Sequence, residues 1–187
     1  FFDRVSPYSV TASATDWGLI PVVLGLGACA AVLAIVFMRS LLWTVAWAKA
    51  RNNDLAVLLL AATLMAVIGM LVPEAVGLGT QSVNDLLAGE KLAAEAALML
   101  IAKLAATVIC IGLGLVGGVF SPALFLGASL GYLAGFVAVG FGFDPSAIVM
   151  LTVVGMAAVT GSVIGAPIGV VLIVFEFTRS YEFAVAA

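Results

Sequence analysis

Apolar residues fill most of the chain in long runs, and short polar or charged segments separate these runs. The first run, residues 17–38, carries no charged residue. At 1.5 Å per residue it is long enough to cross a hydrocarbon core about 30 Å thick. After Arg39 the apolar character continues to Lys49 and includes two tryptophans, which favour the level of lipid headgroups. The pattern predicts one long helix over 17–49 with an interfacial end.

Positive charge gathers between the first two predicted spans. Arg39, Lys49 and Arg51 are three of the seven cations of the chain, and cytoplasmic connections carry an excess of Lys and Arg. We therefore expect this connection to be cytoplasmic, so that the first helix runs inward and residues 55–72 form the return span. Residues 1–16 are polar and turn-rich, and they predict an extramembrane loop.

The later elements are shorter and more often interrupted. Segment 74–90 is too short and too polar to cross a bilayer, and its short helix over 82–88 is either re-entrant and partly buried or a plain surface helix. Residues 93–116 predict a further span. A helix from Asp144-Pro145 to Thr160 is expected to break at Gly161–Gly165, before a short piece over 168–178. Membranes accept such breaks only beside protein or a water-filled path, and in transporters they mark an ion or substrate site.

Composition places the chain in a membrane. Apolar residues make up 65% of it and charged residues only 9%, against about 25% charged in soluble domains. There is no histidine and no cluster with metal-ligand spacing, so neither His-based catalysis nor a metal site is expected. The two cysteines lie in apolar runs, and no basic patch suggests nucleic acid. The chain is interpreted as an integral membrane protein without enzymatic chemistry or a cofactor.

One glycine-rich segment predicts an anion site. Gly117 and Gly118 precede Phe120, and Ser121-Pro122 has the character of a helix start, because proline suits the first turn and a small polar residue can cap free backbone donors. The N-terminus of such a helix, expected at about Ser121, presents unpaired N–H groups and the positive end of the helix dipole, which suit an anion. Alternatively, the glycines only allow neighbouring helices to approach, and Ser-Pro only starts a helix.

Two motifs carry a resemblance to a known family. Residues 117–131, GGVFSPALFLGASLG, closely resemble the Gly-Gly-x-Phe-x-Pro signature of the CLC family of chloride channels and chloride/proton antiporters. Residues 165–169, GAPIG, and the following VVLIVFEFT resemble the family's later Ala-Pro run, which ends in an apolar stretch with Glu and Thr. The order of elements over 17–183 is similar to the second of the family's two inverted halves.

The resemblance implies an all-α polytopic membrane protein with tilted and broken helices. Residues 17–187 would form the C-terminal half of a CLC membrane domain, incomplete at both ends, with the N-terminal half as its partner. The function implied is chloride movement, by a voltage-gated-type channel or by a chloride/proton antiporter, in a plasma or bacterial inner membrane. The alternative is an inverted-repeat transporter of another solute, which would need polar side chains at the midplane that these helices rarely offer.

The resemblance also implies where the anion binds. The backbone amides of Val119 and Phe120 would help to hold a chloride ion, within the motif formed by Gly117, Gly118, Ser121 and Pro122. The family's coordinating serine and gating glutamate belong to motifs that this sequence does not contain. Glu176 and Lys103 lie in apolar runs, where charges are costly and often functional. For both we favour structural pairing over transport.

Glycines at spacings of four predict close helix contacts. One set is Gly127, Gly131 and Gly135, and the other is Gly161, Gly165 and Gly169. In the family the later element borders a two-fold dimer interface in which each subunit keeps its own pore. The resemblance therefore implies a homodimer with a candidate interface of Ile168, Leu172, Ile173 and Phe175. Internal packing is the competing interpretation of that face.

Overall fold

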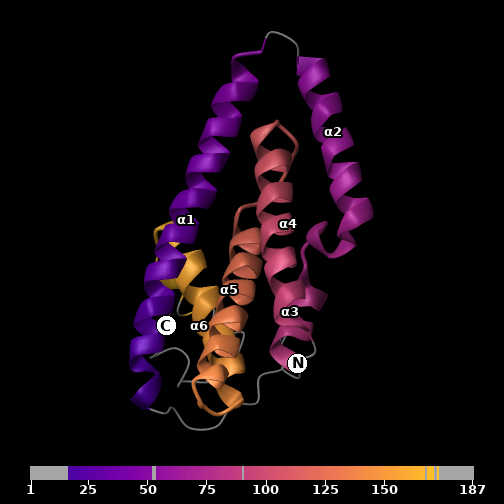
Figure 1. Cartoon of the computed structure of the whole chain (residues 1–187). Helices are drawn as coiled ribbons and strands as arrows, with labels where there is room; N and C mark the ends of the chain where they lie inside the picture. The colour runs from indigo at the N-terminus through magenta and orange to yellow at the C-terminus, as the bar shows by residue number, and fades with distance from the viewer. Residues whose placement is uncertain (1–16, 52–53, 90, 167, 171, 173–187) are drawn as a thin grey trace, which may run out of the picture.

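The computed structural model describes residues 17–51, 54–89, 91–166, 168–170 and 172, and it is helical throughout its regular elements (Figure 1). The predicted loop over 1–16 lies outside these residues. Among the elements whose bounds the described residues define, two 3₁₀ turns, Trp17–Leu19 and Pro73–Ala75, accompany six helices. The helices are α1 (Ile20–Lys49), α2 (Asp54–Leu71), α3 (Thr80–Ala88), α4 (Ala93–Gly112), α5 (Phe120–Gly140) and α6 (Ser146–Ile164). The predicted all-α class is confirmed.

Five of these helices are long and apolar enough to cross a membrane, namely α1, α2, α4, α5 and α6. The predicted first span is a single helix of 30 residues, and at 1.5 Å per residue it is about 45 Å long. Large apolar side chains such as Leu59 and Met70 of α2 are exposed, which suits an environment of lipid or further protein rather than water. The chain is an integral, multi-pass membrane protein.

Helix α4 lies between α1 and α2 and contacts both (Figure 1). Near the connection between α1 and α2, Val57 and Ala61 of α2 pack with Leu113 in a buried cluster that Trp47 partly covers. Closer to the middle of α1, Phe37 is fully buried against residues of α4, α5 and α6. Helix α1 therefore packs on α4, α5 and α6, whereas α2 contacts α4 from the other side.

Helices α5 and α6 form the most closely packed pair of the structure. A Cβ atom added to Gly127 would meet the backbone of Gly155, and one on Gly131 would meet the Leu151 carbonyl group. A Cβ atom on Gly135 would lie 2.5 Å from the Cα atom of Ile148. The backbones approach closely only because these positions have no side chain. The predicted role of this glycine set is confirmed.

Several predicted helix ends need correction. The break expected at Gly161–Gly165 is wrong in its first residues, because Gly161 is buried inside α6 and the helix continues to Ile164. Gly165 alone ends it with a left-handed φ of +73°, the conformation that terminates helices and suits glycine. The span predicted over 93–116 ends at Gly112. There the Leu115 N–H donates to the Cys110 carbonyl oxygen at 2.8 Å, in a Schellman motif around Gly114.

The short helix α3 starts at Thr80, two residues before the predicted start at Ser82. It packs on α5 and α6. Val83, Leu86 and Leu87 are buried in the main core cluster, together with Phe125 and Tyr132 of α5. This favours the partly buried alternative over the plain surface helix.

Candidate functional site

The start of α5 is reached by a tight turn from the end of α4. After Leu115 the chain passes through Gly117, where a Cβ atom would lie only 3.1 Å from the Ile111 side chain. Gly118 is exposed and has open space beside it. Val119 is the N-cap residue of α5, and Phe120 is its first helical residue, one position earlier than predicted. The small size of Gly117 thus lets the chain pass close to Ile111 before the new helix begins, whereas the space beside Gly118 does not require glycine.

The first turn of α5 has free backbone donors. Its first hydrogen bond runs from the Ala123 N–H to the Val119 carbonyl oxygen at 3.0 Å, and Pro122 has no N–H to donate. The N–H groups of Val119, Phe120 and Ser121 have no acceptor within the residues that the structure describes. A 21-residue helix therefore presents free N–H groups and the positive end of its dipole at one place.

Ser121 does not have the predicted capping role. Because the helix starts one residue earlier, Ser121 lies inside the first turn rather than at the N-cap position. Its hydroxyl group donates instead to the Leu78 carbonyl oxygen at 2.9 Å. No side chain caps α5, so the backbone donors keep their binding capacity.

Lys103 lies close to this region and is paired with backbone. Its side chain, on α4, is 2% exposed, and Nζ donates to the carbonyl oxygens of Gly77 at 2.6 Å and Ala75 at 3.0 Å. The same ammonium group lies 5.2 Å from the centroid of the Phe125 ring, within the range of a cation–π contact. The structural pairing favoured for Lys103 from the sequence is confirmed. Its carbonyl partners lie more than 20 residues earlier in the chain, so no local pattern indicated them.

A polar cluster connects the beginning of α4 to α3 and α5. Lys91 Nζ lies 3.0 Å from Glu74 Oε1 and 3.7 Å from Asp85 Oδ2. The hydrogen bond with Glu74 raises the pKa of Lys91 above its ordinary value, since it stabilises the charged amine. Tyr132 of α5 donates its hydroxyl hydrogen to the Lys91 carbonyl oxygen at 2.6 Å. No local sequence pattern indicates this cluster.

The remaining candidate residues are only partly covered by the structure. Ile168 and Leu172 are 78% and 62% exposed. Exposure of this kind is compatible with a dimer interface, because a partner subunit would cover these side chains. Ile173, Phe175 and Glu176 lie outside the described residues. The dimer interface therefore stays a prediction. Among the described residues, no three His, Cys, Asp or Glu side chains come together as metal ligands.

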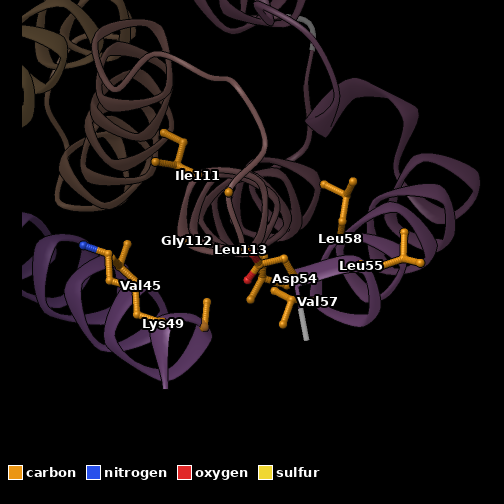
Figure 2. A pocket seen from close by; sticks show the side chains of 11 residues that line it. Val45, Lys49, Asp54, Leu55, Val57, Leu58, Ile111, Gly112 and Leu113 are labelled. Atoms are coloured by element: carbon orange, nitrogen blue, oxygen red, sulfur yellow. The ribbon is translucent and has the colours of Figure 1, made fainter. Parts of the chain in front are cut away.

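A groove of about 530 Å³ lies where the ends of α1 and α4 meet the start of α2 (Figure 2). Apolar side chains including Val45, Val57 and Ile111 line most of it, with Lys49 and Asp54 beside them (Figure 2). None of residues 117–122 lines it. It is therefore separate from the candidate anion site.

Comparison with known proteins identifies the family. The family model described as voltage gated chloride channel matches residues 1–187. A ClcB-like protein of Ralstonia nicotianae is 38% identical over 139 residues, which cover 73% of this chain and 32% of the relative. The H⁺/Cl⁻ exchange transporter ClcA of Vibrio vulnificus is 31% identical over 138 residues, 70% of this chain and 29% of that protein. The chloride channel protein CLC-e of Arabidopsis thaliana is 29% identical over 185 residues, 88% of this chain and 26% of that protein.

The chain thus spans about a third or less of the length of the curated relatives it matches. The names of the exchange transporter and the plant channel describe ion movement rather than catalysis, in agreement with the expectation from the sequence. The match of the family model over the whole length decides the assignment. The chain belongs to the voltage-gated chloride channel family, the CLC family that its glycine-rich motif resembles.

Proposed function

We propose that this chain is part of a protein that moves chloride across a membrane, and that the start of α5 contributes to its anion site. The observation that carries the proposal is the set of free N–H groups at Val119 and Phe120, at the N-terminus of a long helix without a side-chain cap. The family assignment supports chloride as the ion. In this proposal the two amides donate directly to it.

Backbone amides suit an ion that must bind and then leave. A single hydrogen bond to a charged group contributes about 1.5–3 kcal/mol, and several such donors replace part of the hydration shell. The amides carry no full positive charge, so the ion is stabilised without the strong attraction of a buried cation. Passage then needs only the exchange of hydrogen bonds and no covalent step.

The remaining parts of the site come, in this proposal, from the rest of the protein. Since the chain spans about a third or less of its relatives, the other half of the membrane domain would supply further ligands and any gate. The relatives include one protein named as an H⁺/Cl⁻ exchanger and one named as a chloride channel. We therefore propose chloride movement as the common activity, proton-coupled in the antiporter case, with the protein acting as a homodimer.

Bromide provides the direct test, because it replaces chloride and scatters anomalously. Crystals of the full-length protein grown in bromide should show an anomalous peak within hydrogen-bonding distance of the Val119 and Phe120 nitrogen atoms, at about 3.2–3.5 Å given the larger radius of a halide compared with oxygen. A well-occupied full-length structure without density at this place would refute the assignment of the site.

A flux measurement tests the activity separately. Full-length protein in chloride-loaded liposomes should release chloride under a potassium–valinomycin clamp. Residues 1–187 alone should not, because this chain holds only part of the site. Selective and saturable chloride flux from residues 1–187 alone would contradict the division of the site between two halves.

A further inference from the structure

Residues 75–79, which precede α3 in the chain, contact both α4 and the first turn of α5. Three of their carbonyl groups are directed at side chains of these two helices. Ala75 and Gly77 accept from Lys103 of α4, at 3.0 and 2.6 Å. Leu78 accepts from Ser121 of α5, at 2.9 Å. We call residues 75–79 the bridging segment, because no other described segment is held by side chains of both helices through its backbone oxygens.

Lys103 fixes the bridging segment on the α4 side. A buried ammonium group is very costly unless it is hydrogen-bonded. Within the described part of the chain, the Lys103 ammonium group contacts the two carbonyl oxygens and the face of the Phe125 ring. If the segment moved away, the charge would remain buried without acceptors. The hydrogen bonds from Lys103 therefore hold the carbonyl groups of Ala75 and Gly77 in place.

Two contacts fix the same segment on the α5 side. Ser121 binds Leu78, and Gly79 lies against the ring of Phe125, one turn further along the helix. A Cβ atom on Gly79 would lie 2.5 Å from the Phe125 ring, and the residue has a φ of +74°, so both space and backbone conformation require glycine here. The bridging segment is thus held directly against the first two turns of α5.

From this arrangement we infer that Lys103 is a positioning residue for the anion site. Acting through the bridging segment and Ser121, it sets the position of the first turn of α5 and the direction of the N–H groups of Val119 and Phe120. A hydrogen bond weakens steeply as the N–H group turns away from its acceptor. A rotation of this turn would therefore weaken the hydrogen bonds from Val119 and Phe120 to the ion. Lys103 does not itself contact the ion in this inference, which rests on the proposed function.

The test uses full-length protein and bromide binding measured by calorimetry, with thermal stability recorded in parallel. Lys103→Met keeps the length of the side chain but removes its donors, and it should weaken bromide binding about ten-fold. Lys103→Arg can still donate to two carbonyl oxygens and should bind within about three-fold of the parent protein. Thr107→Val is the matched control, since Thr107 is buried on the same helix and bonds only the Lys103 carbonyl oxygen. It should leave bromide affinity unchanged even if stability falls.

A double-mutant cycle separates positioning from general destabilisation. If Lys103 and Ser121 act through one segment, Lys103→Met and Ser121→Ala together should weaken binding less than the product of their separate effects. Independent, multiplicative effects would overturn the inference, and so would full affinity in Lys103→Met or equal losses in Lys103→Met and Thr107→Val. Should Lys103→Met not fold, Lys103→Gln takes its place in the same cycle with the same deciding outcomes.

This inference and the proposed function fail in different ways. If the parent protein shows no bromide near Val119 and Phe120 in the crystal, the proposed function is wrong and the positioning role has no site to serve. If bromide is present there and Lys103→Met binds it as tightly as the parent protein, only the positioning role is wrong.

Discussion

Gly127 of α5 and Gly155 of α6 face each other, and each occupies the space that a side chain on the other would need. A Cβ atom on Gly127 would meet the Gly155 carbonyl oxygen, and a Cβ atom on Gly155 would meet the Gly127 carbonyl oxygen. Both obstacles are backbone atoms, which cannot move aside as the end of a flexible side chain can. The contact between the two helices therefore depends on glycine at both positions.

Gly127→Ala and Gly155→Ala should each destabilise the protein. Either methyl group must push α5 and α6 apart, and overpacking of this kind costs about 1–3 kcal/mol. Gly25→Ala is the control, because nothing lies within 4 Å of the added Cβ atom on α1. Its stability should match the parent or exceed it slightly, since alanine is the better helix former. Equilibrium unfolding of full-length protein in mixed micelles measures both, and an unaffected Gly127→Ala would disprove the close contact.

Tyr132 should stabilise the protein both through its ring and through its hydroxyl group. The side chain is fully buried, and the hydroxyl donates to the Lys91 carbonyl oxygen at 2.6 Å. Tyr132→Phe keeps the ring and loses one hydrogen bond, so it should cost about 0.5–1.5 kcal/mol. Tyr132→Leu also loses the edge-to-face contact with Phe136, at 5.1 Å between centroids, and should cost clearly more. Equal stability of the two variants would show that the ring contact contributes nothing.

Asp144 should make the stability of the protein depend on pH in the acid range. Hydrogen bonding by the side chain and backbone N–H of Ser146 holds the pKa of Asp144 below its ordinary value of 3.8. The charged form is therefore favoured in the folded state, and its contribution is complete above pH 3.8 and lost as the pH falls through the lower, folded-state pKa. Asp144→Asn retains a side-chain oxygen for the Ser146 N–H but does not titrate.

The measurement is the difference in stability between the parent protein and Asp144→Asn, followed from about pH 6 to pH 3. Other carboxylates titrate in both proteins and cancel in the difference. We expect this difference to change below about pH 4, to the disadvantage of the parent protein. A constant difference over the whole range would mean that the Asp144–Ser146 hydrogen bond at 2.8 Å does not contribute to folding.

Features encoded within one segment were predicted correctly from the sequence. The uncharged run after residue 17 forms α1, the return span ends before Pro73, and a helix follows Asp144-Pro145. The spacing of Gly127, Gly131 and Gly135 predicted a close helix contact, and α6 provides it. These features depend on hydrophobic length, on turn residues or on helical periodicity, which are all local.

Features that depend on a distant partner could not be predicted in the same way. Ser121 has the right identity for a cap, but its hydroxyl group binds Leu78, which lies 43 residues earlier. Lys103 was expected to pair, yet only the fold brings Ala75 and Gly77 to it. Gly161 is a residue that often ends a helix, and it stays helical because it is buried in α6. In each case tertiary packing decided between local options.

The face that carries Ile168 and Leu172 provides a test of assembly. Both side chains are exposed within the part of the chain that the structure describes. If they border a dimer interface, Leu172→Trp in the full-length protein should yield monomers in cross-linking and size-exclusion experiments. If each subunit has its own pore, as the family resemblance implies, these monomers should still transport chloride. Dimers that persist, or a protein that no longer folds, would indicate that this face packs internally.

The proposed anion site should respond to changes in the backbone more than to changes in side chains. Val119→Ile and Phe120→Leu leave both N–H groups in place, so they should keep bromide affinity within about two- to three-fold in the full-length protein. Phe120→Pro removes one donor and should weaken binding about ten-fold or more, because a hydrogen bond to a charged group contributes about 1.5–3 kcal/mol.

Proline at position 120 also disfavours the helical conformation of the residue before it, and Val119 has φ −91° and ψ −24°. Part of the loss could therefore come from a distorted turn. A crystal structure of Phe120→Pro separates the two causes, since the loss belongs to the missing donor only if the Val119 nitrogen keeps its place. If Phe120→Leu instead weakens bromide binding as much as Phe120→Pro in an undistorted turn, the side chain rather than the amide holds the ion, and amide coordination at this site is wrong.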